Sequence, residues 1–137
     1  MIKVSVLILT KNGGPEFRTC LEGVCAQTQA GEVEIIVVDS GSTDGTLEFV
    51  ERFPIRLEQI PPETFHHART RNFAATLAKG EVLVFLSQDA VPTSNRWLKE
   101  MVGNFEDLSV GAVYGRQLPK EESSLERQDL LDAVYGV

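Results

Sequence analysis

Three clusters of polar residues could carry chemistry, because each of them follows an apolar run. They are Thr10-Lys11-Asn12, "DSGSTDGT" at residues 39–46, and Ser87-Gln88-Asp89. Together they supply carboxylates, hydroxyls, amides and an amine. Such groups suit a phosphorylated small molecule, because a divalent cation can bridge an acidic side chain and a phosphate.

Asp89 has two possible explanations. It comes shortly after the apolar run Val82–Leu86, and Pro92 follows it. A buried carboxylate without a partner is costly, so Asp89 either lies at a solvated strand end with a function or merely caps a turn. The same structural alternative holds for Asp39 and Asp44, because "DSGSTDG" is typical of loops.

Strands and helices alternate along the chain to position these clusters. Apolar runs predict strands over residues 4–9, 34–38, 81–86 and 110–114, and an alternating run predicts an edge strand over 55–60. Helical spacing of apolar residues predicts helices over 17–24, 47–50, 67–79, 97–105 and 125–135. In the helix over 67–79 we expect Ala68, Phe73, Ala74 and Leu77 to face inward and Gly80 to form the C-cap.

This alternation predicts an α/β fold in which a mostly parallel sheet has helices on both faces, as in a Rossmann-like nucleotide-binding half. The strand over 81–86 is expected to be fully buried, because its apolar run is continuous. Ligands of such sheets bind beyond the carboxyl ends of the strands. The three polar clusters are therefore expected to converge on one cleft.

Composition excludes several classes of protein. The net charge of −7, from 13 basic and 20 acidic residues, argues against nucleic-acid binding. Cys20 and Cys25 lie five residues apart in a helical pattern, so they point in different directions; we expect two apolar packing residues without a disulfide, in a reducing cytoplasm. No signal peptide is visible, and no apolar stretch reaches the roughly 18 residues of a membrane span.

Two common phosphate sites are absent from the sequence. The first strand is followed by "TKNGGPEF", which is not a G-x-G-x-x-G fingerprint, and no G-x-x-x-x-G-K-[ST] motif occurs. The adjacent His66 and His67 do not form a good metal pair, because neighbours on a helix point about 100° apart. Contact of one of them with a ligand remains open.

The remaining motifs resemble a known family. In order and spacing, "VSVLILTKN", "EIIVVDSGSTDGT" and "ARTRNFAATLAKGEVLVFLSQDAVP" are similar to the family 2 nucleotide-sugar glycosyltransferases, which have a GT-A fold. The pairing of "TRNFAA" with "FLSQDA" most resembles the bacterial rhamnosyltransferase-like subgroup. The resemblance covers residues 3–116, which it identifies as a nucleotide-sugar-binding domain. Residues 117–137 are then a segment that leads to an acceptor-side portion.

The resemblance implies a role for each matching residue on the nucleotide side. Thr10 and Asn12 line the nucleotide pocket, and Asp39 accepts a hydrogen bond from the N–H of a uracil or thymine base. Ser40 stands where many family members carry a second acid.

On the phosphate side, the resemblance implies that Arg71 faces the diphosphate, where a guanidinium can bind in a bidentate manner. Asp89 is the metal ligand of a D-x-D-type motif, and it holds Mg²⁺ or Mn²⁺. Gln88 belongs with the donor-binding residues. Ser87 replaces the usual first acid of the motif, so metal and donor are expected to bind together.

The implied function is inverting transfer of a sugar, such as rhamnose, from a dTDP- or UDP-linked donor to a glycan or lipid-linked acceptor in cell-surface polysaccharide synthesis. The expected location is cytoplasmic, at the inner face of the membrane, and peripheral membrane association or a homodimer is compatible with it. None of the late acids can be matched to the catalytic base: Glu121, Glu122, Glu126, Asp129 and Asp132. The alternatives are a non-catalytic nucleotide- or sugar-binding module, and an interaction domain without a ligand.

Overall fold

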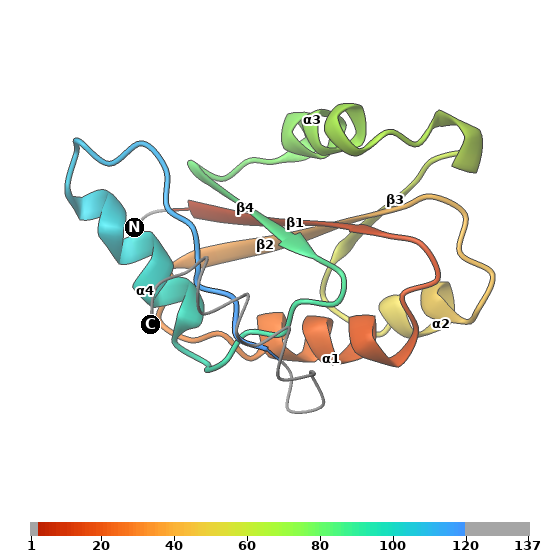
Figure 1. The fold of residues 1–137 in the computed structure, drawn as a ribbon, viewed down its shortest axis with the longest axis horizontal. Coiled ribbons are helices and arrows are strands. Elements are labelled where there is room, and N and C mark those ends of the chain that lie inside the picture. The colour runs from red at the N-terminus through yellow and green to blue at the C-terminus, as the bar shows by residue number, and fades with distance from the viewer. Residues whose placement is uncertain (1–2, 120–137) are drawn as a thin grey trace. The chain divides into compact units, whose positions relative to one another are not determined.

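The computed structural model describes residues 3–119, and its centre is a four-stranded parallel sheet (Figure 1). The strands are β1 (Lys3–Thr10), β2 (Glu32–Asp39), β3 (Arg56–Gln59) and β4 (Val82–Ser87), in the order β3-β2-β1-β4. Every neighbouring pair is parallel. The predicted parallel sheet and the predicted edge position of β3 are confirmed.

Helices cover both faces of the sheet, as the alternation predicts. They are α1 (Gly14–Cys25), α2 (Thr46–Val50), α3 (His67–Leu77) and α4 (Trp97–Gly103), with 3₁₀ turns at Pro62–Thr64 and Asn104–Glu106. Figure 1 shows α3 alone on one face and α1 and α2 on the other. None of the helices among residues 3–119 has the length and apolar content to cross a membrane.

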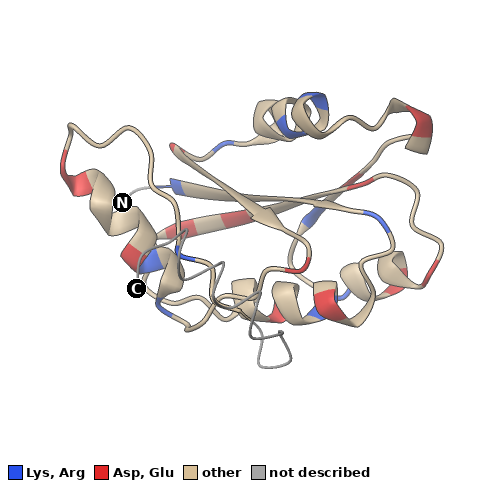
Figure 2. Ribbon diagram, viewed as in Figure 1, with Lys and Arg blue, Asp and Glu red and all other residues tan. Residues whose placement is uncertain are grey.

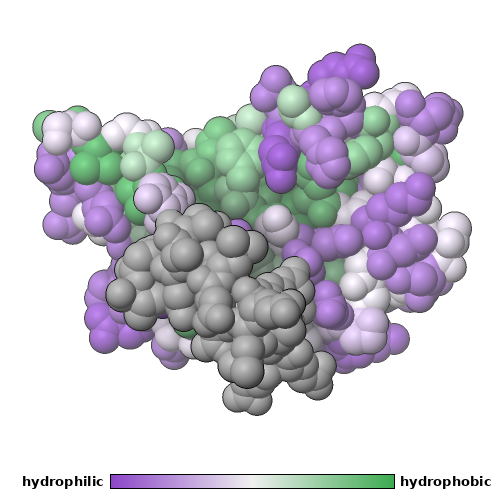
Figure 3. Space-filling view, in the orientation of Figure 1, coloured by the Kyte–Doolittle hydropathy of each residue, from purple (hydrophilic) through white to green (hydrophobic). Residues whose placement is uncertain are grey.

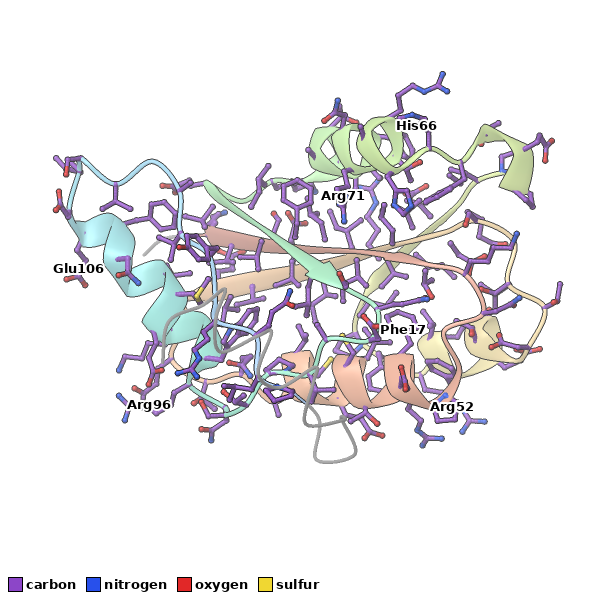
Figure 4. The ribbon with its side chains drawn as sticks, in the orientation of Figure 1. Phe17, Arg52, His66, Arg71, Arg96 and Glu106 are labelled. Carbon is purple, nitrogen blue, oxygen red and sulfur yellow. The ribbon has the colours of Figure 1, made fainter. Side chains whose placement is uncertain are left out.

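The larger core lies between α1 and the sheet. The predicted stripe of α1, Phe17, Cys20, Leu21 and Val24, is fully buried, because spacing at i, i+3, i+4 and i+7 places these side chains on one face. Phe17 points from α1 toward the sheet (Figure 4) and packs at a ring-centroid distance of 5.9 Å from Phe49. The expected burial of Cys25 is wrong, since its side chain is exposed at the end of α1, and both cysteines are free.

The smaller core lies under α3 and shows where the predicted helix differs from the observed one. Ala74 is buried there against Leu7, Ile36 and Val38 of the sheet. The expected inward orientation of Ala68 and Phe73 is wrong: Ala68 is exposed and Phe73 retains 40% of its surface. The reason is that α3 packs on β1 and β2 and leaves the neighbouring part of the sheet open.

Strand β4 is an edge strand, and its expected full burial is wrong. Burial alternates along it: Val82, Val84 and Leu86 pack on the core beneath the sheet, while Leu83 and Phe85 remain 39% and 48% exposed. β1 lies on one side of β4, and no described strand lies on the other. Apolar surface consequently gathers beside α3 over the sheet (Figure 3).

The predicted C-cap at Gly80 is also wrong. Helix α3 ends at Leu77, its C-cap Ala78 is extended, and Gly80 lies against the start of β1. There the buried Ser5 hydroxyl donates to Glu34 Oε1 at 2.5 Å and accepts from the Gly80 amide at 2.8 Å. The Lys79 amide also donates to Glu34, so this network joins the entry of β4 to β1 and β2.

Replacing Gly80 with alanine should destabilise the fold by about 1–3 kcal/mol, as overpacking typically does. A Cβ at this position would lie 2.5 Å from Ser5 Oγ and 2.6 Å from its backbone nitrogen, so the backbone itself would have to shift. Urea unfolding should measure the change. Gly103→Ala is the matched control, because nothing lies within 4 Å of that added methyl group; equal losses in both variants would refute the assignment.

Glu34 should make stability depend on pH in the acid range. Burial raises its pKa, but hydrogen bonds from the Ser5 hydroxyl and from backbone amides lower it by more, so the pKa lies below the ordinary 4.5. Its contribution is therefore complete above pH 4.5 and is lost as the pH falls through the folded-state pKa. Urea titrations from pH 7 to pH 3 should show the stability of wild type approaching that of Glu34→Gln, and a constant difference would contradict this account.

The chain divides into two compact units, Met1–Gly103 and Asn104–Val137. The strand expected over 110–114 is wrong, because residues 107–119 contain no helix or strand. The helix expected over 125–135 and the five late acids lie outside the described residues. The predicted boundary after residue 116 stays a prediction.

Candidate functional site

The three polar clusters lie side by side at the carboxyl edge of the sheet. In the register of the sheet Thr10 is opposite Asp39, and Leu9 is opposite Ser87. Strand β1 is thus the middle of three neighbouring strands that end together. Since adjacent strands are about 4.8 Å apart, the ends of β2 and β4 are roughly 10 Å apart.

Thr10 links the three strand ends through hydrogen bonds. Its carbonyl accepts from the Ser40 amide at 3.0 Å and from the Ser40 hydroxyl at 3.4 Å, on the β2 side. Its hydroxyl donates to Gln88 Oε1 at 2.7 Å, on the β4 side. Thr10 and Ser40 are both only 3% exposed, so these bonds are shielded from water. These buried hydrogen bonds therefore hold the carboxyl ends of β2, β1 and β4 together.

Asp39 organises the loop that follows β2. Its Oδ1 accepts from the amides of Gly41 and Ser42 at 2.9 and 3.0 Å, and its Oδ2 accepts from the Ser42 hydroxyl. The carboxylate is 1% exposed. The structural alternative considered for Asp39 is thus realised, while three bonds still leave one of the roughly four acceptor positions of a carboxylate.

Asn12 fastens the loop after β1 to the loop after β2. The backbone amide of Asn12 donates to Ser42 Oγ at 2.8 Å, and the side-chain oxygen of Asn12 accepts from the backbone amide of Thr43 at 2.7 Å. Its φ of +49° lies in the left-handed region, which asparagine tolerates better than most residues. Asp44 likewise serves the loop, since it accepts from the Thr46 amide and hydroxyl.

A cavity of about 210 Å³ lies between α3 and the ends of β1 and β4. Its apolar lining consists of Leu7, Leu9, Phe65, Phe85 and Leu86. Its polar lining consists of Thr10, Lys11, His67, Arg71, Ser87 and Gln88. Ligand pockets are usually roughly 300–1,000 Å³, so this cavity suits one part of a sugar nucleotide, with the rest outside it.

The charge of the cavity is opposite to that of the chain. Lys11, Arg71 and the imidazole of His67 line it, and no acid does, although the whole chain has a net charge of −7. Helix α3 carries Arg69 and Arg71 and no acid (Figure 2). Arg71 lies on the side of α3 that faces the sheet (Figure 4). The site thus favours an anion.

The two histidines have separate places. His66 is the N-cap of α3, where Nδ1 accepts from the Arg69 amide at 3.5 Å. His67 lines the cavity and meets the ring of Phe65 edge-on at 5.0 Å. The sequence left open which histidine could touch a ligand, and the structure selects His67.

Of the sequence-predicted site residues, the structure brings Thr10, Arg71 and Gln88 into one cavity. Asn12, Asp39 and Asp89 do not line it. Sequence reasoning missed Lys11, Phe65, Phe85 and Ser87; the position of Lys11 and Ser87 inside polar clusters was the available signal. The assigned roles of the predicted residues stay predictions.

Asp89 occupies the turn after β4. The Ala90 amide donates to the Ser87 carbonyl at 3.0 Å, so Gln88 and Asp89 are the central residues of this turn. Asp89 is exposed. The pKa of the buried Cys20 thiol is raised to about 12, mainly by burial and to a smaller extent by the negative charges of Asp89 and Cys25. Asp89 therefore lies outside the cavity lining, in the exposed turn that follows β4.

The side chains at the carboxyl edge of the sheet suit a hard cation only if a phosphorylated ligand supplies further oxygen atoms. Among residues 3–119 no group of three His, Cys, Asp or Glu side chains could hold a metal. One carboxylate with phosphate oxygens and water is nevertheless a common way to bind Mg²⁺. Asp89 meets that requirement, while the oxygen of Gln88 is already bonded to Thr10.

Comparison with known proteins gives a family match over most of the chain. The family model described as glycosyl transferase family 2 matches residues 5–132. The O-antigen chain rhamnosyltransferase RfbN of Salmonella typhimurium is 34% identical over 125 residues, which are 90% of this chain and 40% of that protein. The chain thus spans well under half the length of this curated relative.

Solved structures give the same fold. The mannosyltransferase PcManGT from Pyrobaculum calidifontis, in complex with GDP-Man and Mn²⁺, is 29% identical with a TM-score of 0.71, over 79% of this chain and 33% of that one. Residues 1–349 of TarS from S. aureus, in complex with UDP-GlcNAc, are 26% identical with a TM-score of 0.70, over 87% of this chain and 37% of that one. The expected GT-A architecture is confirmed.

Proposed function

Because the chain belongs to glycosyl transferase family 2, we propose that it is the donor-binding part of an inverting glycosyltransferase. The proposed donor is a sugar, such as rhamnose, linked to UDP or dTDP, and the acceptor is a glycan or a lipid-linked glycan. RfbN supports the choice of rhamnose, since it is named as a rhamnosyltransferase of the O-antigen chain. We also propose that it works in the cytoplasm, at the inner face of the membrane.

The acid-free cavity beside α3 is the observation that carries this proposal. Lys11 and Arg71 line it in a chain of net charge −7, so its charge suits a diphosphate and not a cationic ligand. A guanidinium can bind two phosphate oxygens at once. Leu9, Phe65 and Phe85 supply the apolar surface that a sugar or base ring can cover.

Asp89 would hold Mg²⁺ or Mn²⁺ in the proposed complex. When bound, this cation neutralises the negative charge that grows on the departing nucleoside diphosphate. Arg71 and Lys11 would orient the phosphates from the other side. PcManGT supports the use of a divalent cation, because its structure contains GDP-Man with Mn²⁺.

Asp39 would recognise the pyrimidine base by accepting its N–H. The carboxylate is 1% exposed and bonded to its own loop, so the Ser42 hydroxyl must turn aside to admit a base. The amides of Gly41 and Ser42 would then keep the carboxylate in place. TarS supports a uracil nucleotide, since its structure contains UDP-GlcNAc.

The proposal is tested by titrating the full-length protein with UDP and dTDP, each with and without Mn²⁺, and measuring the unfolding temperature. We expect one nucleotide to stabilise the protein and Mn²⁺ to increase that effect, because ligands that bind only the folded state raise its stability. No shift with either nucleotide would refute the proposal. The second candidate, a non-catalytic nucleotide-binding module, predicts the same shifts without sugar transfer to any acceptor.

A further inference from the structure

The side chain of Gln88 continues the ladder between β1 and β4 after the backbone ladder has ended. The last paired residues of these strands are Leu9 and Ser87. Beyond them, Gln88 Oε1 accepts from the Lys11 amide at 3.2 Å, and Gln88 Nε2 donates to the Lys11 carbonyl at 3.5 Å. The carboxamide therefore takes the place that a backbone peptide group would occupy in a longer strand.

A third bond extends this link to the buried centre of the edge. Gln88 Oε1 also accepts from the Thr10 hydroxyl at 2.7 Å, and the Thr10 carbonyl is bonded to Ser40 on the far side. A continuous path of hydrogen bonds thus crosses the ends of β4, β1 and β2. A carboxamide can both accept and donate at the Lys11 backbone, whereas an ionised carboxylate lacks the donor and the thioether of methionine is only a weak acceptor.

The link fixes the turn that carries Asp89. Gln88 and Asp89 are the two central residues of that turn, which the bond from Ala90 to Ser87 closes. Asp89 itself is exposed. The side chain of its neighbour therefore ties the turn to β1, whose next residue, Lys11, lines the cavity. Lys11 and Asp89 are held in one arrangement by the same carboxamide.

We propose that Gln88 is a positioning residue, which fastens the Asp89 turn to the end of β1 and so fixes the place of the carboxylate that would hold the cation. The inference rests on the proposed function, and it assigns to Gln88 a role through Thr10 and Lys11 without contact to the cation. Its bond to Thr10 is shielded from water, because Thr10 is 3% exposed.

The test measures UDP and dTDP affinity of the full-length protein by calorimetry, with and without Mn²⁺, in Gln88→Met, Thr10→Val and the double variant. In Thr10→Val the gain in affinity that Mn²⁺ provides should be about tenfold smaller, which is typical of the loss of one shielded hydrogen bond. In Gln88→Met the gain should fall by at least as much, because this variant also removes the two bonds to the Lys11 backbone. Both residues line the cavity, so affinity without Mn²⁺ can fall as well, and the readout is the ratio of the affinities with and without Mn²⁺. The double variant should lose no more than Gln88→Met alone, because Gln88→Met already removes the bond to Thr10. Thr10→Ser keeps the hydroxyl and should restore the gain.

Several outcomes would overturn the inference. Additive losses in the double variant would mean that Gln88 and Thr10 act separately, and equal losses with and without Mn²⁺ would mean a general structural defect. If Gln88→Met does not fold, the comparison of Thr10→Val with Thr10→Ser decides by itself. Wild-type protein that binds neither nucleotide would refute the proposed function, whereas wild-type binding with an unchanged Gln88→Met would refute only the role of Gln88.

Discussion

Asp89→Asn should lower sugar transfer by the full-length protein at least on the order of 100-fold and remove the effect of Mn²⁺ on nucleotide binding. Among residues 3–119 no group of three metal-ligating side chains occurs, so the substitution removes the anionic ligand that this part of the chain would supply. A bound cation supplies several kcal/mol of charge stabilisation, and each 1.36 kcal/mol corresponds to about tenfold in rate. Transfer rates and calorimetric titrations over a series of Mn²⁺ concentrations would measure both effects.

The matched control for this variant is Asp44→Asn. Asp44 is also an exposed turn aspartate near the carboxyl edge of the sheet, but it follows β2 and bonds to the Thr46 hydroxyl at the start of α2. This control should retain the response to Mn²⁺. If Asp89→Asn also retains it, the cation is held elsewhere, and the assignment of Asp89 to the metal must be abandoned.

Arg71→Ala should weaken binding of UDP or dTDP by roughly 30-fold, which corresponds to about 2 kcal/mol for the loss of hydrogen bonds between charged groups. Arg71 lines the cavity from α3 and is the guanidinium placed to bind the diphosphate there. Arg71→Lys should recover only part of the loss, because an ammonium cannot make the two parallel hydrogen bonds of a guanidinium. Calorimetry without Mn²⁺ would isolate this contribution from that of the cation.

Arg69→Ala is the control for the helix and for its charge. Arg69 is exposed on α3, two residues before Arg71, and does not line the cavity. Its loss should leave affinity within about twofold, because exposed charges are screened by salt. Equal effects of the two variants would indicate a diffuse electrostatic attraction and would contradict a specific diphosphate contact at Arg71.

The architecture was predictable because it depends on periodicity. The stripe of α1, Phe17, Cys20, Leu21 and Val24, can be buried only if those residues form a helix, and the apolar runs of β1 and β2 require cover on both faces. Parallel strands then bring their carboxyl ends together. The three polar clusters are therefore adjacent because they follow strands that the apolar pattern of the sequence predicts.

The details of α3 and β4 could not be predicted, because they depend on what lies beside them. The run Val82–Leu86 is equally compatible with a central strand and with an edge strand, and only the strand order decides between them. Phe73 likewise fits an apolar stripe and yet remains 40% exposed, because α3 packs on β1 and β2. Gly80 matches a C-cap by position, although its observed role is a close approach to Ser5.

The site was predictable in part for a similar reason. Thr10, Arg71 and Gln88 could be selected from motifs that resemble a family, and the structure groups them in one cavity. Phe65 had no comparable signal, because its contribution comes from the path of the chain from β3 into α3. The hydrogen bonds that occupy Asp39 also depend on the exact loop conformation, which composition does not specify.

The half-covered strand β4 has a practical consequence for anyone who purifies these 137 residues. Its outer edge offers amide and carbonyl groups beside the exposed rings and methyl groups of Phe85 and Leu83, with no described strand to occupy them. Such an edge is a template for adding strands from other molecules. We therefore expect self-association that grows with concentration, and light scattering on dilution should show it reversing.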